Sequence, residues 1–166
     1  MILIGIGANL PSHAGPPTAT AVAALAQMAP LGIKVVALSP WYESAPQPPS
    51  DQPWYLNGVA RVTTALGPEA LLKALHGIES GFGRAPGLRN AARPLDLDVL
   101  AYDRLVLAGD VELPHPRLQE RAFVLAPLCD LAPDWRHPRL GLTALELFTR
   151  LPPGQDLRRC APDHRS

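Results

Sequence analysis

The chain has 166 residues, which is enough for one domain with a sizeable hydrophobic core. Its 15 basic and 15 acidic residues give a formal net charge of zero, so no general positive field attracts nucleic acid or an anionic membrane. No apolar run approaches the ~20 residues of a membrane span, and the first residues lack the basic start of a signal peptide. The 2 cysteines lie at no metal-type spacing, which is typical of a protein in a reducing compartment. Taken together, these features predict a cytoplasmic protein without nucleic-acid or membrane partners.

Prolines punctuate the first half of the chain and predict short elements joined by stiff loops. The apolar, β-branched residues 1–8 predict a buried strand. A helix is predicted over residues 18–29, where apolar residues recur at helical spacing. The elements predicted next are a strand over residues 33–42, an irregular proline-rich loop over 43–53 and a strand over 54–66.

The second half begins with a predicted helix over residues 68–82, which carries one apolar stripe. The later predicted elements are a strand over residues 95–100, a short strand over 105–108, a rigid loop over 113–117, a helical run over 121–131 and a helix over 143–151. Thr143 and Glu146 form a capping box that starts the last helix. The polar residues 152–166 are expected to fray.

The order strand, helix, strand, strand, helix, strand is that of ferredoxin-like folds. We therefore predict an α+β protein with a βαββαβ antiparallel sheet, both helices on one face, and a C-terminal helical extension. The opposite face of the sheet is expected to stay free and to carry a site. Residues 1–151 are expected to form a single domain, followed by the tail 152–166.

One stretch, residues 84–100, combines arginines with a pair of acids. Arg84, Arg89 and Arg93 lie in a segment whose prolines and glycine indicate a loop. Asp96 and Asp98 then alternate with apolar residues, so both project from one face of a strand with Cα atoms ~6.6 Å apart. Guanidinium groups bind phosphate bidentately, and Mg²⁺ takes carboxylates together with substrate phosphates. The stretch favours a polyphosphate and metal site, although a solvated strand face beside a charged loop gives the same pattern.

Other candidate residues allow two interpretations each. Tyr55 and Asn57 share a strand face, where a ring could stack on a flat heterocycle and an amide could read its edge, but an ordinary cross-strand aromatic beside an exposed Asn is an alternative. Glu79, in a helix's last turn, is either a solvated surface group or a ligand contact. His115, in its proline loop, is either a structural hydrogen-bonding group or part of a site.

Three motifs occur in an order that resembles the 6-hydroxymethyl-7,8-dihydropterin pyrophosphokinase family. They are Asp-Gln-Pro-Trp-Tyr-Leu-Asn at 51–57, Arg-Pro-Leu-Asp-Leu-Asp at 93–98, and Pro-His at 114–115 followed by Arg-Ala-Phe-Val-Leu at 121–125. The resemblance runs from Gly-Ala-Asn-Leu at 7–10 to about residue 133. It implies a ferredoxin-like, cytoplasmic monomer that transfers the pyrophosphoryl group of ATP to the pterin hydroxymethyl oxygen and releases AMP.

The resemblance also implies roles for individual residues. Two Mg²⁺ ions would bind Asp96 and Asp98 when ATP is present, and the catalytic set implied is Arg84, Arg93, Asp96 and Asp98. The ATP-binding residues implied are Glu79, Arg84, Arg89, Arg93, Val99, His115 and Arg121. The pterin-binding residues implied are Ser44, Ala45, Tyr55, Asn57 and Phe123, with Tyr55 and Phe123 sandwiching the ring.

The chain departs from the family in the segments implied to contact ATP. Asn90 stands where many members have Trp, Pro94 replaces a common Thr, and Pro116 replaces a Tyr of some members. Two other functional classes remain open from the fold alone. A ferredoxin-like nucleic-acid binder would need a basic surface, and a small-molecule regulatory module would not need the paired acids.

Overall fold

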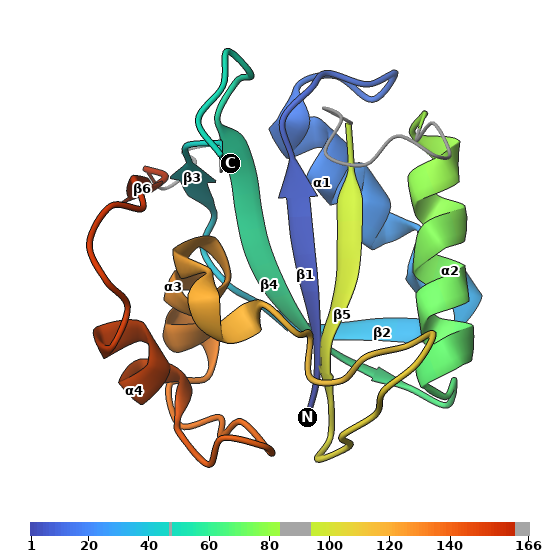
Figure 1. Ribbon diagram of the computed structural model, residues 1–166. Coiled ribbons are helices and arrows are strands. Elements are labelled where there is room, and N and C mark those ends of the chain that lie inside the picture. Colours follow the sequence, from blue (N-terminus) through green and yellow to red (C-terminus); the bar gives the residue numbers. More distant parts are fainter. Residues whose placement is uncertain (47, 84–93, 162–166) are drawn as a thin grey trace.

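The computed structural model describes residues 1–46, 48–83 and 94–161 and contains a six-stranded antiparallel sheet with helices on both faces (Figure 1). The strands are β1 (Ile2–Ala8), β2 (Ile33–Leu38), β3 (Tyr42–Ser44), β4 (Tyr55–Thr64), β5 (Asp96–Tyr102) and β6 (Leu157–Arg159). The α-helices are α1 (Pro17–Ala26), α2 (Pro68–Gly81), α3 (Ala122–Leu131) and α4 (Ala144–Thr149), with 3₁₀ turns at Ala29–Leu31 and Leu118–Glu120. The predicted α+β class is thereby confirmed.

The strands follow the order β5-β1-β4-β3-β6, and β2 pairs with β4 beside β3. The single strand predicted over residues 33–42 is divided into β2 and β3 because Pro40 has no N–H to donate to the ladder. Ser39 bridges the interruption. Its N–H donates to the Val59 carbonyl at 2.9 Å, and its hydroxyl accepts the Val59 N–H at 2.9 Å.

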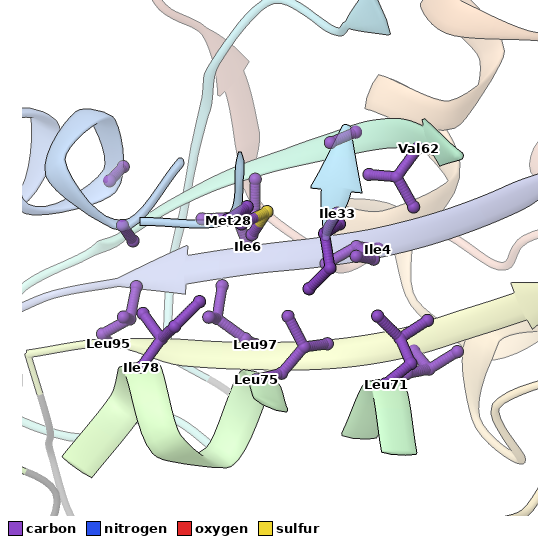
Figure 2. Close-up of a cluster of buried hydrophobic side chains, with 14 of the residues drawn as sticks. Ile4, Ile6, Met28, Ile33, Val62, Leu71, Leu75, Ile78, Leu95 and Leu97 are labelled. Carbon is purple, nitrogen blue, oxygen red and sulfur yellow. The ribbon is translucent and has the colours of Figure 1, made fainter. Parts of the chain in front are cut away.

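The first hydrophobic core lies between the sheet and helices α1 and α2 (Figure 2). Figure 2 shows the predicted stripe of α2, Leu71, Leu75 and Ile78, directed toward the strands. Alternate residues of β1 (Ile2, Ile4 and Ile6) and of the β5 region (Leu95, Leu97 and Val99) complete this core. The alternation predicted for residues 95–99 is therefore confirmed, since its apolar half is buried here.

A second core covers half of the opposite face, which was predicted to be free. Helices α3 and α4 pack there on Leu3, Val59 and Leu100. Ile4 pairs with Val99 but Leu3 pairs with Ala101, so Leu100 is an extra residue at a β-bulge, and both Leu100 and Ala101 join this core. The sequence pattern did not reveal this packing because α3 is apolar around most of its circumference. Among the described residues, none of these helices covers the other end of this sheet face, where a cleft lies.

The C-terminal part of the chain confirms one prediction and contradicts two. The capping box is present, because the Glu146 N–H donates to the Thr143 hydroxyl at 3.1 Å and the Thr143 N–H to the Glu146 carboxylate at 3.2 Å. The strand predicted over residues 105–108 is absent, and a single bridge joins Leu107 to Leu113. The tail predicted to fray instead forms β6 at Leu157–Arg159, while residues 162–166 lie outside the described part. No helix within the described residues is long and apolar enough to cross a bilayer.

Two glycines make a contrasting pair for a stability test. A Cβ atom on Gly58 would lie 2.6 and 2.7 Å from two ring atoms of Trp41, whereas one on Gly77, an exposed position within α2, would meet nothing within 4 Å. We expect Gly58→Ala to lower the free energy of unfolding by about 1–3 kcal/mol because the indole must move. Gly77→Ala should raise it by about 0.5–1 kcal/mol. Urea denaturation measures both, and equal effects would contradict this packing.

Candidate active site

A cleft occupies the open end of the second sheet face, bordered by β1, β4, β5, the end of β3 and the start of α3. It contains about 900 Å³ of space, part of it open to solvent. The residues that line it include most of the described candidates, Ser44, Ala45, Tyr55, Asn57, Asp96, Asp98, Arg121 and Phe123. The fold therefore brings the predicted metal and pterin residues into one place.

Two glycines of the central strand β1 form the floor of the cleft. Gly7 lies between Asn57 on β4 and Asp96 on β5, and Gly5 lies between Val59 and Asp98 in the same way. Neighbouring strands are ~4.8 Å apart, so Asn57 and Asp96 face each other across roughly 10 Å with no side chain between them. Sequence patterns alone assigned no role to either glycine, although glycine inside a strand is a sign of close approach by a ligand or backbone.

The two acids lie on one face of β5, as predicted. Asp96 and Asp98 are partly buried and line the cleft, while Leu97 between them points into the first core. β5 is an edge strand, so the Leu97 N–H points away from β1 and donates to the Glu79 carboxylate at 2.7 Å. Glu79 is 0% exposed, so its interpretation as a solvated surface group is wrong. The buried carboxylate fixes the segment of β5 that carries both acids.

Asn57 is held at the other side of the floor. It is 5% exposed, so the alternative of an exposed Asn beside an ordinary aromatic is wrong. Its amide nitrogen donates to the Ser44 hydroxyl at 2.6 Å, and its Oδ1 atom lies next to Gly7, 3.4 Å from where a Cβ would be. This fixes which end of the amide faces the cleft, with an acceptor oxygen directed over the glycine floor.

The ring of Tyr55 is anchored through its hydroxyl. The hydroxyl donates to the side-chain oxygen Oε1 of Gln52 at 3.1 Å, and the same oxygen accepts an N–H of the Asn9 side-chain amide at 3.2 Å. Asn9 is buried, so this chain of hydrogen bonds links the loop after β1 to the ring. Asn9 and Gln52 belong to the motifs at 7–10 and 51–57, but the sequence assigned neither a role. The structure shows that they hold the aromatic side chain.

His115 and Arg121 provide donors near the acids. The main-chain N–H of His115 donates to the Leu100 carbonyl at 2.8 Å. The Nδ1 atom of its ring accepts the main-chain N–H of Arg117 at 3.2 Å. Because Nδ1 is an acceptor, the imidazole proton resides on Nε2. Burial, and then the charge of Arg121, lowers the pKa of His115 from 6.5 to about 4, so the ring is neutral at pH 7. His115 is thus both a structural hydrogen-bonding group and a neutral donor beside the site.

The guanidinium of Arg121 lies over the ring of Phe123, with its central carbon 5.3 Å from the ring centre. Burial, and then the charge of Arg117, lowers the pKa of Arg121, while Asp98 and Asp96 act in the opposite direction. An arginine remains charged under these conditions. The cleft therefore has a cation opposite its two acids, next to an apolar ring.

One residue that the resemblance assigns to ATP binding, Val99, cannot contribute through its side chain. The Val99 side chain is buried in the first core, on the opposite face of β5 from the acids, so only its main chain could contact a ligand. The three arginines Arg84, Arg89 and Arg93 lie outside the described residues. Their roles remain predictions.

The low pKa of His115 should make the free energy of unfolding depend on pH. Between pH 6.5 and pH 4 the unfolded chain binds a proton at His115 that the folded protein does not, so stability falls as pH is lowered through this window. His115→Asn keeps an acceptor for Arg117 and removes the titration. Between pH 7 and pH 4.5 the free energy of unfolding should fall in both proteins. We expect the fall to be smaller in the variant by roughly 1–2 kcal/mol and not more, because partial exposure of His115 weakens the effect of its pKa shift. Urea denaturation at each pH measures both proteins. An equal fall in the free energy of unfolding in the two would contradict the lowered pKa of His115.

Comparison with known proteins agrees with the geometry of the cleft. The family model described as 7,8-dihydro-6-hydroxymethylpterin-pyrophosphokinase (HPPK) matches residues 3–133, more than half of the chain. A protein of Synechocystis sp. named 2-amino-4-hydroxy-6-hydroxymethyldihydropteridine pyrophosphokinase is 38% identical over 151 residues, which are 90% of this chain and 75% of that protein. A Pseudomonas aeruginosa protein of the same name is 49% identical over 106 residues, 63% of this chain and 65% of that protein.

Among solved structures, wild-type HPPK-DHPS of Plasmodium falciparum superposes with a TM-score of 0.67 at 12% identity, covering 90% of this chain and 44% of that one. At this identity the likeness supports the fold alone. The family model and the Synechocystis relative carry the assignment. The chain belongs to the 7,8-dihydro-6-hydroxymethylpterin-pyrophosphokinase family.

Proposed function

We propose that this chain transfers the β,γ-pyrophosphoryl group of ATP to the hydroxymethyl oxygen of 6-hydroxymethyl-7,8-dihydropterin and releases AMP, as a step of folate synthesis. The observation that carries the proposal is that Asp96 and Asp98 share one cleft with Tyr55, Asn57 and Phe123. A pair of acids suited to a phosphate-bound metal therefore lies beside a pair of rings suited to a flat heterocycle.

The pterin half of the cleft fits a ring held between two aromatic faces. Tyr55 and Phe123 both line the cleft, from β4 and α3 respectively. The edge of a pterin carries an amino group and a ring N–H, both of which can donate to a carboxamide oxygen. The amide nitrogen of Asn57 is already engaged by Ser44, so its oxygen is the atom directed at such donors. A ring lying over Gly7 would place its substituents toward the acids.

Asp96 and Asp98 supply carboxylate oxygens, the ligands that Mg²⁺ prefers, and we propose that they hold two magnesium ions when ATP is bound. The ions would neutralise phosphate charge and polarise the transferred group. Arg121 is placed to balance the phosphate charge, and the Nε2–H of neutral His115 can donate to a phosphate oxygen. We assign Arg84, Arg89 and Arg93 to further phosphate contacts, because these guanidinium groups immediately precede the acids in sequence.

The proposal includes the finer features of the fold. Taking β2 and β3 as one interrupted strand, the order β5-β1-β4-β2/β3 with antiparallel neighbours is that of a ferredoxin-like core, extended by α3, α4 and β6. We further propose a monomer located in the cytoplasm without nucleic-acid or membrane partners, since its formal net charge of zero gives no attraction to polyanions.

A direct test is AMP release from ATP in the presence of Mg²⁺ and the hydroxymethyl pterin. We expect Asp96→Asn and Asp98→Asn each to lower kcat by about 100-fold or more, because metal-assisted charge stabilisation is lost. Folding, followed by thermal melting, should be preserved. Glu69→Gln, at an exposed acid in the first turn of α2, is the control with unchanged kcat.

Other results would favour other functions. AMP release that does not require the pterin would indicate an ATP hydrolase. Full function in Asp96→Asn would favour a small-molecule regulatory module, and strong salt-dependent retention on a polyanion column would favour a nucleic-acid binder.

The glycine floor gives a second test. A Cβ on Gly7 would meet Asn57 and Asp96 at 3.4 and 4.0 Å, which are ordinary contact distances, so the fold should accept a side chain there. Gly7→Val would fill the space where we place the pterin ring and should weaken pterin binding roughly tenfold or more. Gly7→Ala, which adds less volume, should have a smaller effect. Calorimetric titration measures both, and unchanged affinity in Gly7→Val would place the pterin elsewhere.

A further inference from the structure

The segment after α4 runs back along the molecule and pairs as β6 with β3 (Figure 1). Ser44 at the end of β3 lines the cleft. The segment lies outside residues 3–133, the part that matches the family model. We propose that residues 155–157 of this segment position two walls of the pterin pocket, and that Gln155 is a positioning residue for substrate binding. The inference rests on the proposed function.

Gln155 fixes the start of α3 from outside the helix. Its side-chain oxygen accepts the Ala122 N–H at 2.9 Å, and its side-chain nitrogen donates to the Glu120 carbonyl at 2.9 Å. These two main-chain groups lie on either side of Arg121, the N-cap residue, which makes no side-chain capping bond. The first N–H groups of a helix need such external acceptors. One amide therefore holds the backbone that carries Arg121 and Phe123.

The two residues that follow hold the opposite wall. The Asp156 carbonyl accepts the Ala45 N–H at 3.1 Å, and Leu157 pairs with Ser44 in the β3–β6 ladder. The Ser44 hydroxyl in turn accepts an N–H of the Asn57 side-chain amide. Residues of both walls and residues 155–157 together line one small hollow, which shares Ser44, Ala45 and Phe123 with the cleft. Three consecutive residues thus connect the end of β3 and the residue after it, Ser44 and Ala45, with the start of α3.

The remaining contacts of β6 fasten the segment at the surface. The Arg158 guanidinium pairs with the Glu43 carboxylate at 2.6 Å and lies over the Trp54 ring, 4.8 Å from its centre. Arg159 approaches Asp130 at 3.8 Å. Exposed ion pairs of this kind contribute little to stability and do not touch the cleft. Arg158 is therefore a matched control, because it belongs to the same segment but not to the link between the walls.

The test compares wild type, Gln155→Ala and Arg158→Ala in two measurements on the full chain. The first is amide hydrogen exchange without ligand, in which the Ala122 N–H should exchange about tenfold faster in Gln155→Ala because its acceptor is gone. The second is calorimetric titration with the hydroxymethyl pterin, Mg²⁺ and a non-hydrolysable ATP analogue. Here Gln155→Ala should raise the pterin Kd about tenfold at a stoichiometry near one, since the loosened walls must be ordered on binding. Arg158→Ala should stay within about twofold.

Each outcome bears on the inference. A purely structural role would lower the melting temperature and the binding stoichiometry of Gln155→Ala while leaving the Kd of the folded fraction unchanged, and this would overturn the proposal. Should Gln155→Ala fold poorly, Gln155→Glu keeps the acceptor for Ala122 but loses the donor to Glu120, and an unchanged Kd in that variant would overturn it equally. If the wild type shows protected Ala122 exchange but binds no pterin, the proposed function fails and the link between the walls remains.

Discussion

The alternation of side chains along β1 is the constraint on which the site depends. Ile2, Ile4 and Ile6 face α1 and α2 and anchor the strand in the first core. Leu3, Gly5 and Gly7 face the other side, where Leu3 joins the second core and the two glycines place no side chain in the cleft. A shift of one residue in register would put isoleucine into the cleft and glycine into the core. The same packing that stabilises the sheet therefore also keeps the cleft open.

Main-chain contacts hold two of the groups around this opening. Glu79 binds the N–H of Leu97 and so fixes the strand between the two acids. The Arg117 N–H determines which nitrogen of His115 carries the proton, and burial keeps that ring neutral. Both arrangements are complete before any ligand arrives. Preorganised groups of this kind stabilise transferred phosphate without the cost of reorienting water or side chains.

Sequence reasoning was strongest where a residue's role follows from local period. The alternation at residues 95–99 predicted both the acid pair and the buried face of β5, and the motif at 51–57 contained Tyr55 and Asn57, which line the cleft from β4. It failed where roles depend on partners distant in sequence. For Glu79, a solvated position and a ligand contact both stayed open, because its partner, the Leu97 N–H, is 18 residues away. The tail appeared disordered because its composition is polar, yet its main chain pairs with β3.

The uneven covering of the second sheet face explains why such distant contacts matter for function. Leu3, Val59 and Leu100 bind α3 firmly at one end of the face, whereas the start of α3 extends past them to the rim of the cleft. Arg121 and Phe123, at this start of the helix, both line the cleft. A helix start in this position needs support from elsewhere, and the segment around Gln155 is where the chain provides it. Because the cleft lies beside the second core and not within it, the positions of Arg121 and Phe123 depend on residues 155–157, where the last strand begins.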